Sequence, residues 1–159
     1  MKKPFILVCV ILLCFCLQVK AQKNSVHWIS FEQLEYYLTV KPKKVFISLY
    51  TDWCAYCKKM DKVTFKDSKV ISLLNNNYYA VKMNAESLDT IIFDGKKFTN
   101  KRINESRKPI HEIPLLLASR KNSPFSLPAN LILNKNFTIK ERYFEYLSPE
   151  KMKDILTNK

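Results

Sequence analysis

The chain has 159 residues, enough for one domain, with 27 Lys and Arg against 14 Asp and Glu and a formal net charge of +13. Its only glycine, Gly95, argues against nucleotide chemistry, because the loops that hold phosphates need several glycines for close backbone approach. The lysines are scattered, which favours a solvated surface over an acidic partner or an anionic membrane. No nucleic-acid motif accompanies them, so nucleic acid is not an expected partner.

The N-terminus has two lysines, then an uncharged and mostly apolar run over residues 4–19, then a small residue, Ala21. This order is typical of a secretory signal peptide, so we expect residues 1–21 to be removed and residues 22–159 to form the domain. An uncleaved anchor helix is the alternative, but the run is short for one, because a span needs roughly 20 apolar residues. Export predicts that the domain lies in the periplasm.

Hydrophobic spacing and turn signals predict the remaining elements. In chain order they are a strand over 26–28, a helix over 31–40, a strand over 45–50, a helix opened by a cysteine pair, a helix over 70–74, a strand over 78–83, a hairpin over 91–98, a helix over 110–119, strands over 131–133 and 137–144, and a helix from 148. Ser30 and Gln33 match a capping box, and Asp94-Gly95 is a strong hairpin signal. Strands that alternate with helices predict an α/β fold with a central mixed sheet flanked by helices.

Two prolines mark helices in the second half of the chain. Pro114 either starts or kinks the helix over 110–119, because it cannot donate a backbone hydrogen bond. Pro149 follows Ser148 and occupies the first position of the terminal helix, where a proline is well tolerated.

Removal of the signal peptide leaves two of the five cysteines, Cys54 and Cys57, within the run WCAYC. A structural staple is one interpretation, but closing so short a ring contributes only roughly 2 kcal/mol. Half of a metal site is another, yet a closed zinc site needs four ligands, and His27 and His111 lack the spacing to supply the rest. We therefore expect no metal and no cofactor.

A reactive pair is the interpretation that these residues favour most. The cysteines open a helix, where free N–H groups and the positive end of the helix dipole favour a thiolate, and Lys58 and Lys59 add positive potential. Cys54 is the outer residue and is expected to be the nucleophile. Cys57, one turn inward, is expected to be more buried and to resolve the mixed disulfide.

The WCAYC run after an apolar strand resembles the thioredoxin family, in its exported bacterial branch. The resemblance covers about residues 26–156 and includes Leu127-Pro128 before a strand. It implies a thioredoxin fold in which Cys54 and Cys57 are the catalytic redox disulfide. A hairpin-plus-helix insertion over about 87–126 is similar to a subgroup of exported thioredoxin-like proteins.

The resemblance also implies supporting residues around the pair. Pro128 is expected to have a cis peptide bond and to contact the substrate backbone. Trp53 is expected to pack against and shield the site, and Tyr56 either contacts substrate or is an ordinary exposed aromatic residue. Lys82 is expected to be partly buried near the pair, as a candidate modulator of its ionisation.

One residue departs from the family pattern in a way that affects the chemistry. Thioredoxins have a buried aspartate six residues before the first cysteine, and this chain has Ser48 there. A serine cannot take a proton from Cys57. Resolution of the mixed disulfide is therefore expected to differ from that of thioredoxins, unless Glu86 or Lys82 takes the place of the aspartate.

The sequence predicts a monomeric, periplasmic thiol–disulfide oxidoreductase that acts on protein thiols or disulfides. A reductase or isomerase direction is expected, with electrons exchanged with a membrane or periplasmic partner protein. The alternative is a binding module that holds a protein partner, or captures a metal transiently, with little redox turnover.

Overall fold

The computed structural model describes residues 25–158, so the expected signal peptide over 1–21 lies outside the described residues. The elements in chain order are β1 (Trp28–Ile29), α2 (Phe31–Val40), β2 (Lys44–Tyr50), α3 (Ala55–Lys62), the 3-10 turn η1 (Thr64–Lys66), α4 (Ser68–Asn77), β3 (Tyr78–Asn84), β4 (Ile91–Phe93), β5 (Lys96–Phe98), α5 (Glu112–Ala118), β6 (Ala129–Leu133), β7 (Ile139–Tyr143) and α6 (Pro149–Asn158). Every element that the sequence predicts is present, with bounds that differ by a few residues at most.

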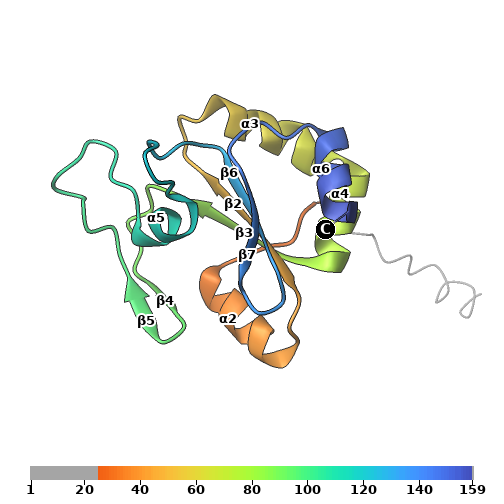
Figure 1. Cartoon of the computed structure of the whole chain (residues 1–159), viewed down its shortest axis with the longest axis horizontal. Helices are drawn as coiled ribbons and strands as arrows, with labels where there is room; N and C mark the ends of the chain where they lie inside the picture. The colour runs from red at the N-terminus through yellow and green to blue at the C-terminus, as the bar shows by residue number, and fades with distance from the viewer. Residues whose placement is uncertain (1–24, 159) are drawn as a thin grey trace, which may run out of the picture.

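Five strands form one mixed sheet in the order β1-β3-β2-β6-β7 (Figure 1). β2 pairs in parallel with β3 and antiparallel with β6, so it lies at the centre of the sheet. All five residues 45–49 of β2 are buried, as expected for an apolar strand covered on both faces.

Helices cover both faces of this sheet, and each face has its own core. Val45, Ile47 and Leu49 face the layer that contains α2 and α5. Phe46 faces the layer of α3, α4 and α6, where it packs in the same cluster as Met60 (Figure 1). Because side chains alternate along a strand, the even-numbered residues of β2, Ser48 included, point towards the α3 layer.

Local capping explains where the helices begin. Ser30 accepts a hydrogen bond from the Gln33 N–H, and the Gln33 side chain accepts one from the Ser30 N–H, which completes the predicted capping box of α2. Asp67 caps α4. Pro149 is the first residue of α6, which confirms the prediction for that proline. α5 begins at Glu112, so Pro114 lies in its first turn, where a missing N–H costs little.

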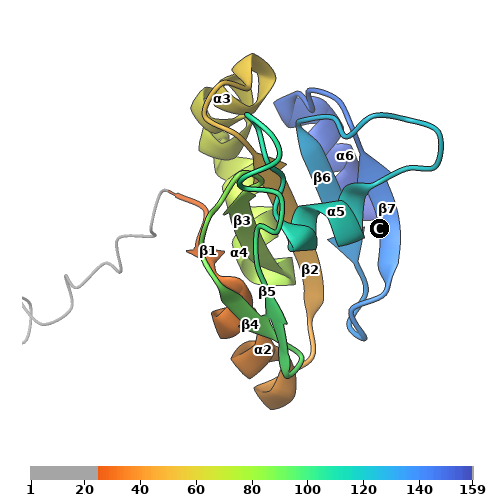
Figure 2. The ribbon, with the colours of Figure 1, turned by 90° about the vertical axis from the view of Figure 1, so that its left-hand side faces the viewer.

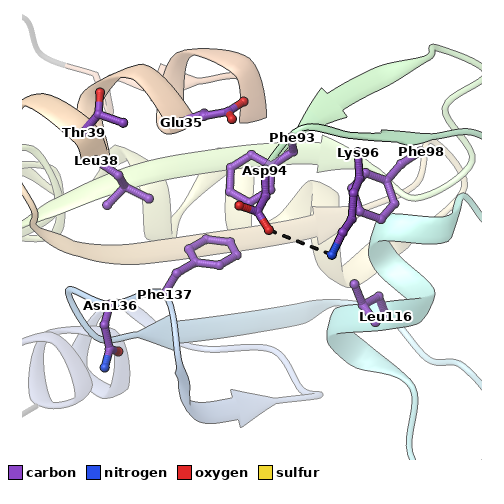
Figure 3. Close-up of a pocket in the computed structure, with 10 residues that line it drawn as sticks. All are labelled: Glu35, Leu38, Thr39, Phe93, Asp94, Lys96, Phe98, Leu116, Asn136 and Phe137. Carbon is purple, nitrogen blue, oxygen red and sulfur yellow. Dashed lines mark ion pairs between the residues drawn. The ribbon is translucent and has the colours of Figure 1, made fainter.

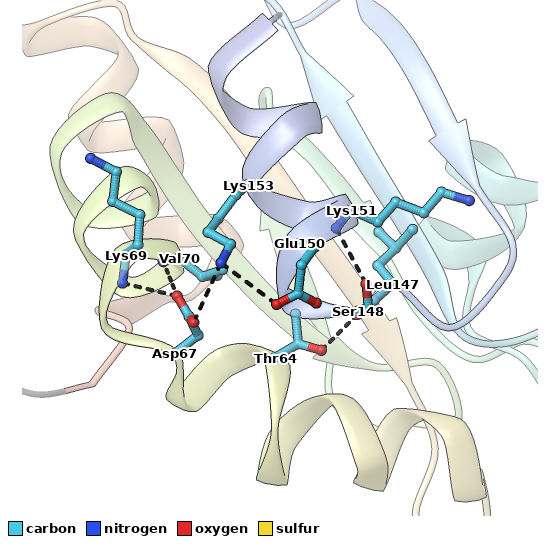
Figure 4. Close-up of polar contacts among 9 residues, drawn as sticks. All are labelled: Thr64, Asp67, Lys69, Val70, Leu147, Ser148, Glu150, Lys151 and Lys153. Atoms are coloured by element: carbon cyan, nitrogen blue, oxygen red, sulfur yellow. Dashed lines mark hydrogen bonds and ion pairs between the residues drawn. The ribbon is translucent and has the colours of Figure 1, made fainter.

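Polar contacts join η1, α4 and α6 on the α3 side of the sheet, as Figure 4 shows. The Thr64 hydroxyl is buried and donates to the Leu147 carbonyl at 2.6 Å. The Lys153 ammonium lies 3.9 Å from the carboxylate of Asp67. These contacts link the start of α4 to the C-terminal helix and support the layer that carries α3.

The predicted insertion over 87–126 forms a second, two-stranded sheet and the short helix α5, beside the α2 face (Figure 2). Asp94 and Gly95 both have positive φ, at 53° and 64°, which is the backbone shape of a two-residue hairpin turn. Between β5 and α5 the chain follows an irregular path from residue 99 to residue 111. In Figure 1 this path forms the loop that projects outward beside α5.

Candidate active site

Cys54 and Cys57 form a disulfide with their Cα atoms 5.3 Å apart. Cys54 is the N-cap of α3 and Cys57 lies in its first turn. Both residues are 5% exposed, so the expectation that Cys57 is the more buried of the two is wrong for the disulfide state.

The backbone around the disulfide favours negative charge on Cys54. The Cys57 N–H donates to Cys54 Sγ at 3.2 Å, so the sulfur occupies the position that an oxygen takes in an ordinary helix cap. The α3 dipole has its positive end here, and Lys58 and Lys59 are exposed in the next positions. When the disulfide is reduced, this arrangement can stabilise a Cys54 thiolate.

Trp53 stands beside the disulfide and is 53% exposed. Its indole N–H donates to Glu86 Oε1 at 2.9 Å. On the ring face, the Lys108 ammonium lies 4.0 Å from the ring centre, in a cation–π arrangement. Trp53 is thus held between the end of β3 and the insertion, and Glu86 is engaged by the indole.

Tyr56 is 61% exposed and lies between the two cysteines in sequence. Its ring centre is 6.3 Å from that of Tyr146, in the segment before α6. The Lys59 ammonium lies 4.5 Å from the centre of the Tyr146 ring. A second aromatic and cationic group therefore flanks the disulfide, close to the predicted substrate-contacting tyrosine.

The Leu127–Pro128 peptide bond is cis, which confirms that part of the expectation for Pro128. Pro128 is buried and directly precedes Ala129, which pairs with Leu49 near the end of β2. The segment 51–54 continues from that same end of β2. The sheet register therefore places Pro128 at the end of the sheet where the disulfide segment begins. Its contact with substrate stays a prediction.

A row of polar residues crosses the sheet on the face that α3 covers. Ser48 pairs in register with Lys82 of β3 on one side and with Asn130 of β6 on the other. Ser48 and Asn130 are 3% and 0% exposed. Ser48 thus occupies a buried position in the sheet below α3, and its neighbours are a cation and an amide.

Lys82 is partly buried, as expected, and its ammonium forms an ion pair with Asp61 in the second turn of α3. It also lies 4.7 Å from the centre of the Tyr50 ring. Burial, then the charges of Asp52 and Asp61, raise the pKa of Tyr50, so this phenol stays neutral beside the ammonium. The Lys82 charge is therefore balanced locally, and an effect of it on the cysteines stays a prediction.

Asn130 was not among the residues that the sequence pattern singled out. Its amide nitrogen donates to Met60 Sδ at 3.6 Å, a weak contact, and its buried Oδ1 has no partner among the described residues. Thr51 Oγ1, three residues before Cys54, is likewise buried without a hydrogen-bond partner among the described residues. The signal was available in the run ANLIL, where one amide interrupts an apolar strand.

His111 is fully buried and caps α5. Its Nδ1 accepts from the Ile113 N–H at 3.1 Å, and its Nε2 lies 3.2 Å from the Asp89 carbonyl. Burial lowers the pKa of His111, and this outweighs the opposing hydrogen bond to Asp89. A neutral ring that accepts at Nδ1 and donates at Nε2 satisfies both contacts.

An apolar groove of about 590 Å³ lies on the α2 side of the molecule (Figure 3). Its walls come from α2, the β4–β5 hairpin, α5 and the turn after β6, and Phe93, Phe98 and Phe137 give it an aromatic lining. No predicted site residue lines it. The groove is therefore separate from the chemistry of the disulfide.

Two further properties concern metals and membranes. Within residues 25–158, no three His, Cys, Asp or Glu side chains gather as a metal site would require. In the same residues, no helix is both long enough and apolar enough to span a bilayer.

A mixed β2–β3–β6 sheet, a CxxC disulfide at the start of the following helix and a cis-proline before the next strand define a thioredoxin-like protein of the thiol–disulfide oxidoreductase class. The family model described as "Thioredox_DsbH: Protein of unknown function, DUF255" matches residues 15–103, more than half of the chain. The protein belongs to this family.

Sequence relatives and solved structures agree with that placement. A "Thiol:disulfide interchange protein DsbD" of Yersinia pestis (strain Pestoides F) is 34% identical over 107 residues, 52% of this chain and 18% of the relative. The chain spans less than a fifth of the length of the curated relatives that it matches first.

Two solved structures share the fold. A thioredoxin from Thermus thermophilus has a TM-score of 0.57 at 14% identity, over 84% of this chain and 86% of its own. A putative disulphide-isomerase from Bacteroides thetaiotaomicron has a TM-score of 0.54 at 24% identity, over 85% and 93%. Both likenesses concern the thioredoxin fold.

Proposed function

We propose that the protein exchanges thiols and disulfides with other proteins through Cys54 and Cys57, in the direction of reduction or isomerisation. The observation that carries this proposal is the hydrogen bond from the Cys57 N–H to Cys54 Sγ at the N-cap of α3. It supports a thiolate at Cys54, the sulfur that attacks the substrate in this proposal. The relatives named thiol:disulfide interchange proteins support the same chemistry.

In the reducing direction the steps balance as follows. The Cys54 thiolate attacks one sulfur of a substrate disulfide, and the other substrate sulfur leaves as a thiolate that takes up a proton. Cys57 then loses its proton and attacks Cys54 Sγ, which releases the second substrate thiol and forms the Cys54–Cys57 disulfide. Two electrons pass to the substrate, and a dithiol of an electron-donor protein must return two electrons to the pair.

The surrounding residues have supporting roles in this proposal. Pro128, at the end of the sheet where the disulfide segment begins, contacts the backbone of the substrate next to the substrate cysteine. Trp53 and Tyr56, each next to a cysteine of the pair in the chain, present exposed aromatic surface. Lys82 adjusts the charge under α3 through its ion pair with Asp61. Glu86 is occupied by the Trp53 indole, so the proton of Cys57 leaves to solvent.

We place this activity in the periplasm, in a monomer that takes electrons from a membrane or periplasmic dithiol protein. The apolar N-terminal run supports export. The match to a part of the longer interchange proteins supports a place in the same class of electron transfer, with protein thiols and disulfides as the exchange partners.

Trapping and reduction potential together test the proposal. In periplasmic extracts, Cys57→Ser should accumulate mixed disulfides through Cys54, and a Cys54→Ser/Cys57→Ser control should not. A potential near about −270 mV supports a reductase, and one near about −120 mV supports an oxidase instead. If Cys57→Ser traps nothing and the wild type reduces no model disulfide, the domain is a binding module.

A further inference from the structure

Residues 99–111, here called the basic loop, join β5 to α5. Hydrogen bonds tie the two ends of this loop together. The Asn100 amide donates to the Pro109 carbonyl at 2.8 Å and to the Ser87 carbonyl at 3.2 Å. The Glu112 carboxylate accepts from the Thr99 N–H at 2.8 Å. Compact surface loops whose ends are tied in this way are frequently functional.

The C-terminal end of the basic loop is hydrogen-bonded to the end of the sheet from which the disulfide segment continues. The His111 N–H donates to the Ala85 carbonyl at 2.8 Å, and the Ala85 N–H donates to the Tyr50 carbonyl at 2.7 Å. Tyr50 is the last residue of β2, four positions before Cys54. The root of the basic loop is therefore fixed relative to the cysteine pair.

The charges of the basic loop are balanced at its start and unbalanced at its end. Lys101 pairs with Glu112 at 2.5 Å, and Arg102 pairs with Glu105 at 3.5 Å. Arg107 and Lys108 are exposed, and within residues 25–158 neither forms an ion pair with a carboxylate. Uncompensated positive charge therefore lies at the end of the basic loop that meets the active site.

Lys108 brings that charge to Trp53, the residue before Cys54, because its ammonium lies 4.0 Å from the centre of the Trp53 ring. Trp53 is 53% exposed and Ile103, farther along the basic loop, is 47% exposed. Two carboxylates are also close to this surface: Glu86 accepts from the Trp53 indole, and Asp52 accepts from the Asn84 amide at 3.4 Å. Both donors are neutral, and among the described residues neither carboxylate forms an ion pair with Arg107 or Lys108. The surface beside Cys54 thus combines cations with apolar area.

We propose that the basic loop is a recognition arm that selects protein substrates with acidic residues beside the reactive cysteine. This inference rests on the proposed function, since a thiol or disulfide partner must approach Cys54 past Trp53. An extended segment with Asp or Glu next to its cysteine would place carboxylates against Arg107 and Lys108. Complementary charge at such a surface raises association rates more than final affinity.

The test uses three disulfides and the reduced full-length protein. Two are disulfide-linked peptides that are identical except that Asp and Glu flank the cysteines in one, and Asn and Gln in the other. The third is hydroxyethyl disulfide, which is small and uncharged. Second-order rate constants come from acid quenching and mass spectrometry, at low salt and again at 0.5 M salt.

We expect the wild type to reduce the acidic peptide about tenfold faster than the neutral one at low salt, with the ratio falling towards one at high salt. Arg107→Gln/Lys108→Gln should bring the ratio close to one at low salt. The matched control is Lys135→Gln/Lys140→Gln, which removes the same charge. Those exposed lysines lie in the β6–β7 turn and on β7. The turn is at the end of the strands opposite to the disulfide segment.

Three results would overturn the inference: no preference in the wild type, a ratio that Arg107→Gln/Lys108→Gln leaves intact, or an equal loss in the Lys135→Gln/Lys140→Gln control. Circular dichroism checks that each variant is folded. Reduction of hydroxyethyl disulfide without a preference for the acidic peptide overturns only this inference. No reduction of any of the three disulfides means that the proposed function fails, and the inference fails with it.

Discussion

Ser48 is the cross-strand neighbour of Asn130 in the β2–β6 ladder, and both residues are buried on the face that α3 covers. A carboxylate at such a site could accept a proton from a thiol, but neither a serine hydroxyl nor an amide accepts one near neutral pH. The reduced pair is therefore expected to lose the Cys57 proton to solvent, which slows resolution of the mixed disulfide.

Replacing Ser48 with aspartate should supply the missing acceptor. We expect Ser48→Asp to accelerate single-turnover reduction of hydroxyethyl disulfide by about 10²-fold, the lower range for general-base catalysis. Burial raises the pKa of such a carboxyl, so the gain should increase with pH through its titration. The buried acid should also lower the free energy of unfolding by about 2 kcal/mol. Stopped-flow kinetics and urea denaturation measure the two effects.

Ser48→Asn is the matched control, since it adds nearly the same volume and no proton acceptor. It should leave the rate close to that of the wild type. An equal acceleration in both variants would mean that the change acts through packing and that proton transfer at residue 48 does not limit the reaction.

The two cysteines should differ in reactivity after reduction, although they are equally buried in the disulfide. The Cys57 N–H donates to Cys54 Sγ, so the thiolate should form on Cys54. At pH 7 we expect iodoacetamide to label Cys54 at least about tenfold faster than Cys57. Peptide mapping by mass spectrometry separates the two sites. Faster labelling of Cys57 would reverse the proposed roles of nucleophile and resolving residue.

His111 should make stability depend on pH. Burial lowers its pKa in the native state, whereas in the unfolded chain the pKa is about 6.5. Below about pH 6.5 the unfolded state therefore binds a proton that the native state refuses, and the free energy of unfolding decreases as the pH falls. Above that pH the full stability is present. Urea denaturation from pH 7.5 to pH 5 follows the change.

Comparison with His111→Asn isolates this contribution, because an asparagine oxygen can also cap α5 but does not titrate. The variant should be nearly as stable as the wild type at pH 7.5 and should lose less stability at pH 5. Parallel pH profiles for the two proteins would show that the acid sensitivity arises from other groups.

Asn100 should keep the basic loop in a fixed conformation, since its side-chain amide donates hydrogen bonds to the carbonyls of Ser87 and Pro109. Asn100→Ala leaves two part-buried carbonyls without these donors, and we expect a loss of about 1–2 kcal/mol in the free energy of unfolding. Trypsin should then cut after Lys101, Arg102 or Arg107 sooner than in the wild type. Asn76→Ala, which changes an exposed asparagine on α4, is the control and should have little effect on either.

Most elements of this fold could be predicted because their signals are local. The Ser30–Gln33 box closes over three residues, and the Asp94-Gly95 turn needs only two residues with positive φ. The apolar run of β2 has to be buried wherever it lies. Cys54 and Cys57 are close in the chain, so their pairing at a helix start depends on few other residues.

The surroundings of the pair could not be predicted in the same way. Lys82 was expected near the cysteines, but its partner Asp61 comes from a helix whose position depends on packing. Asn130 is 82 positions after Ser48, and only the antiparallel register places them opposite each other. A slip of one residue would point each of these side chains to the other face of the sheet.

By itself, the sequence determined the order of strands and helices, the position of the cysteine pair at the start of α3 and the class of chemistry that such a pair can perform. The tertiary structure decided what surrounds α3 and the pair: Ser48 and Asn130 lie buried side by side in the sheet below α3, and Lys108 lies over the ring of Trp53. The physical reason is that caps, turns and short rings form between residues a few positions apart. Sheet register and the path of the basic loop, in contrast, are set by burial of the whole core.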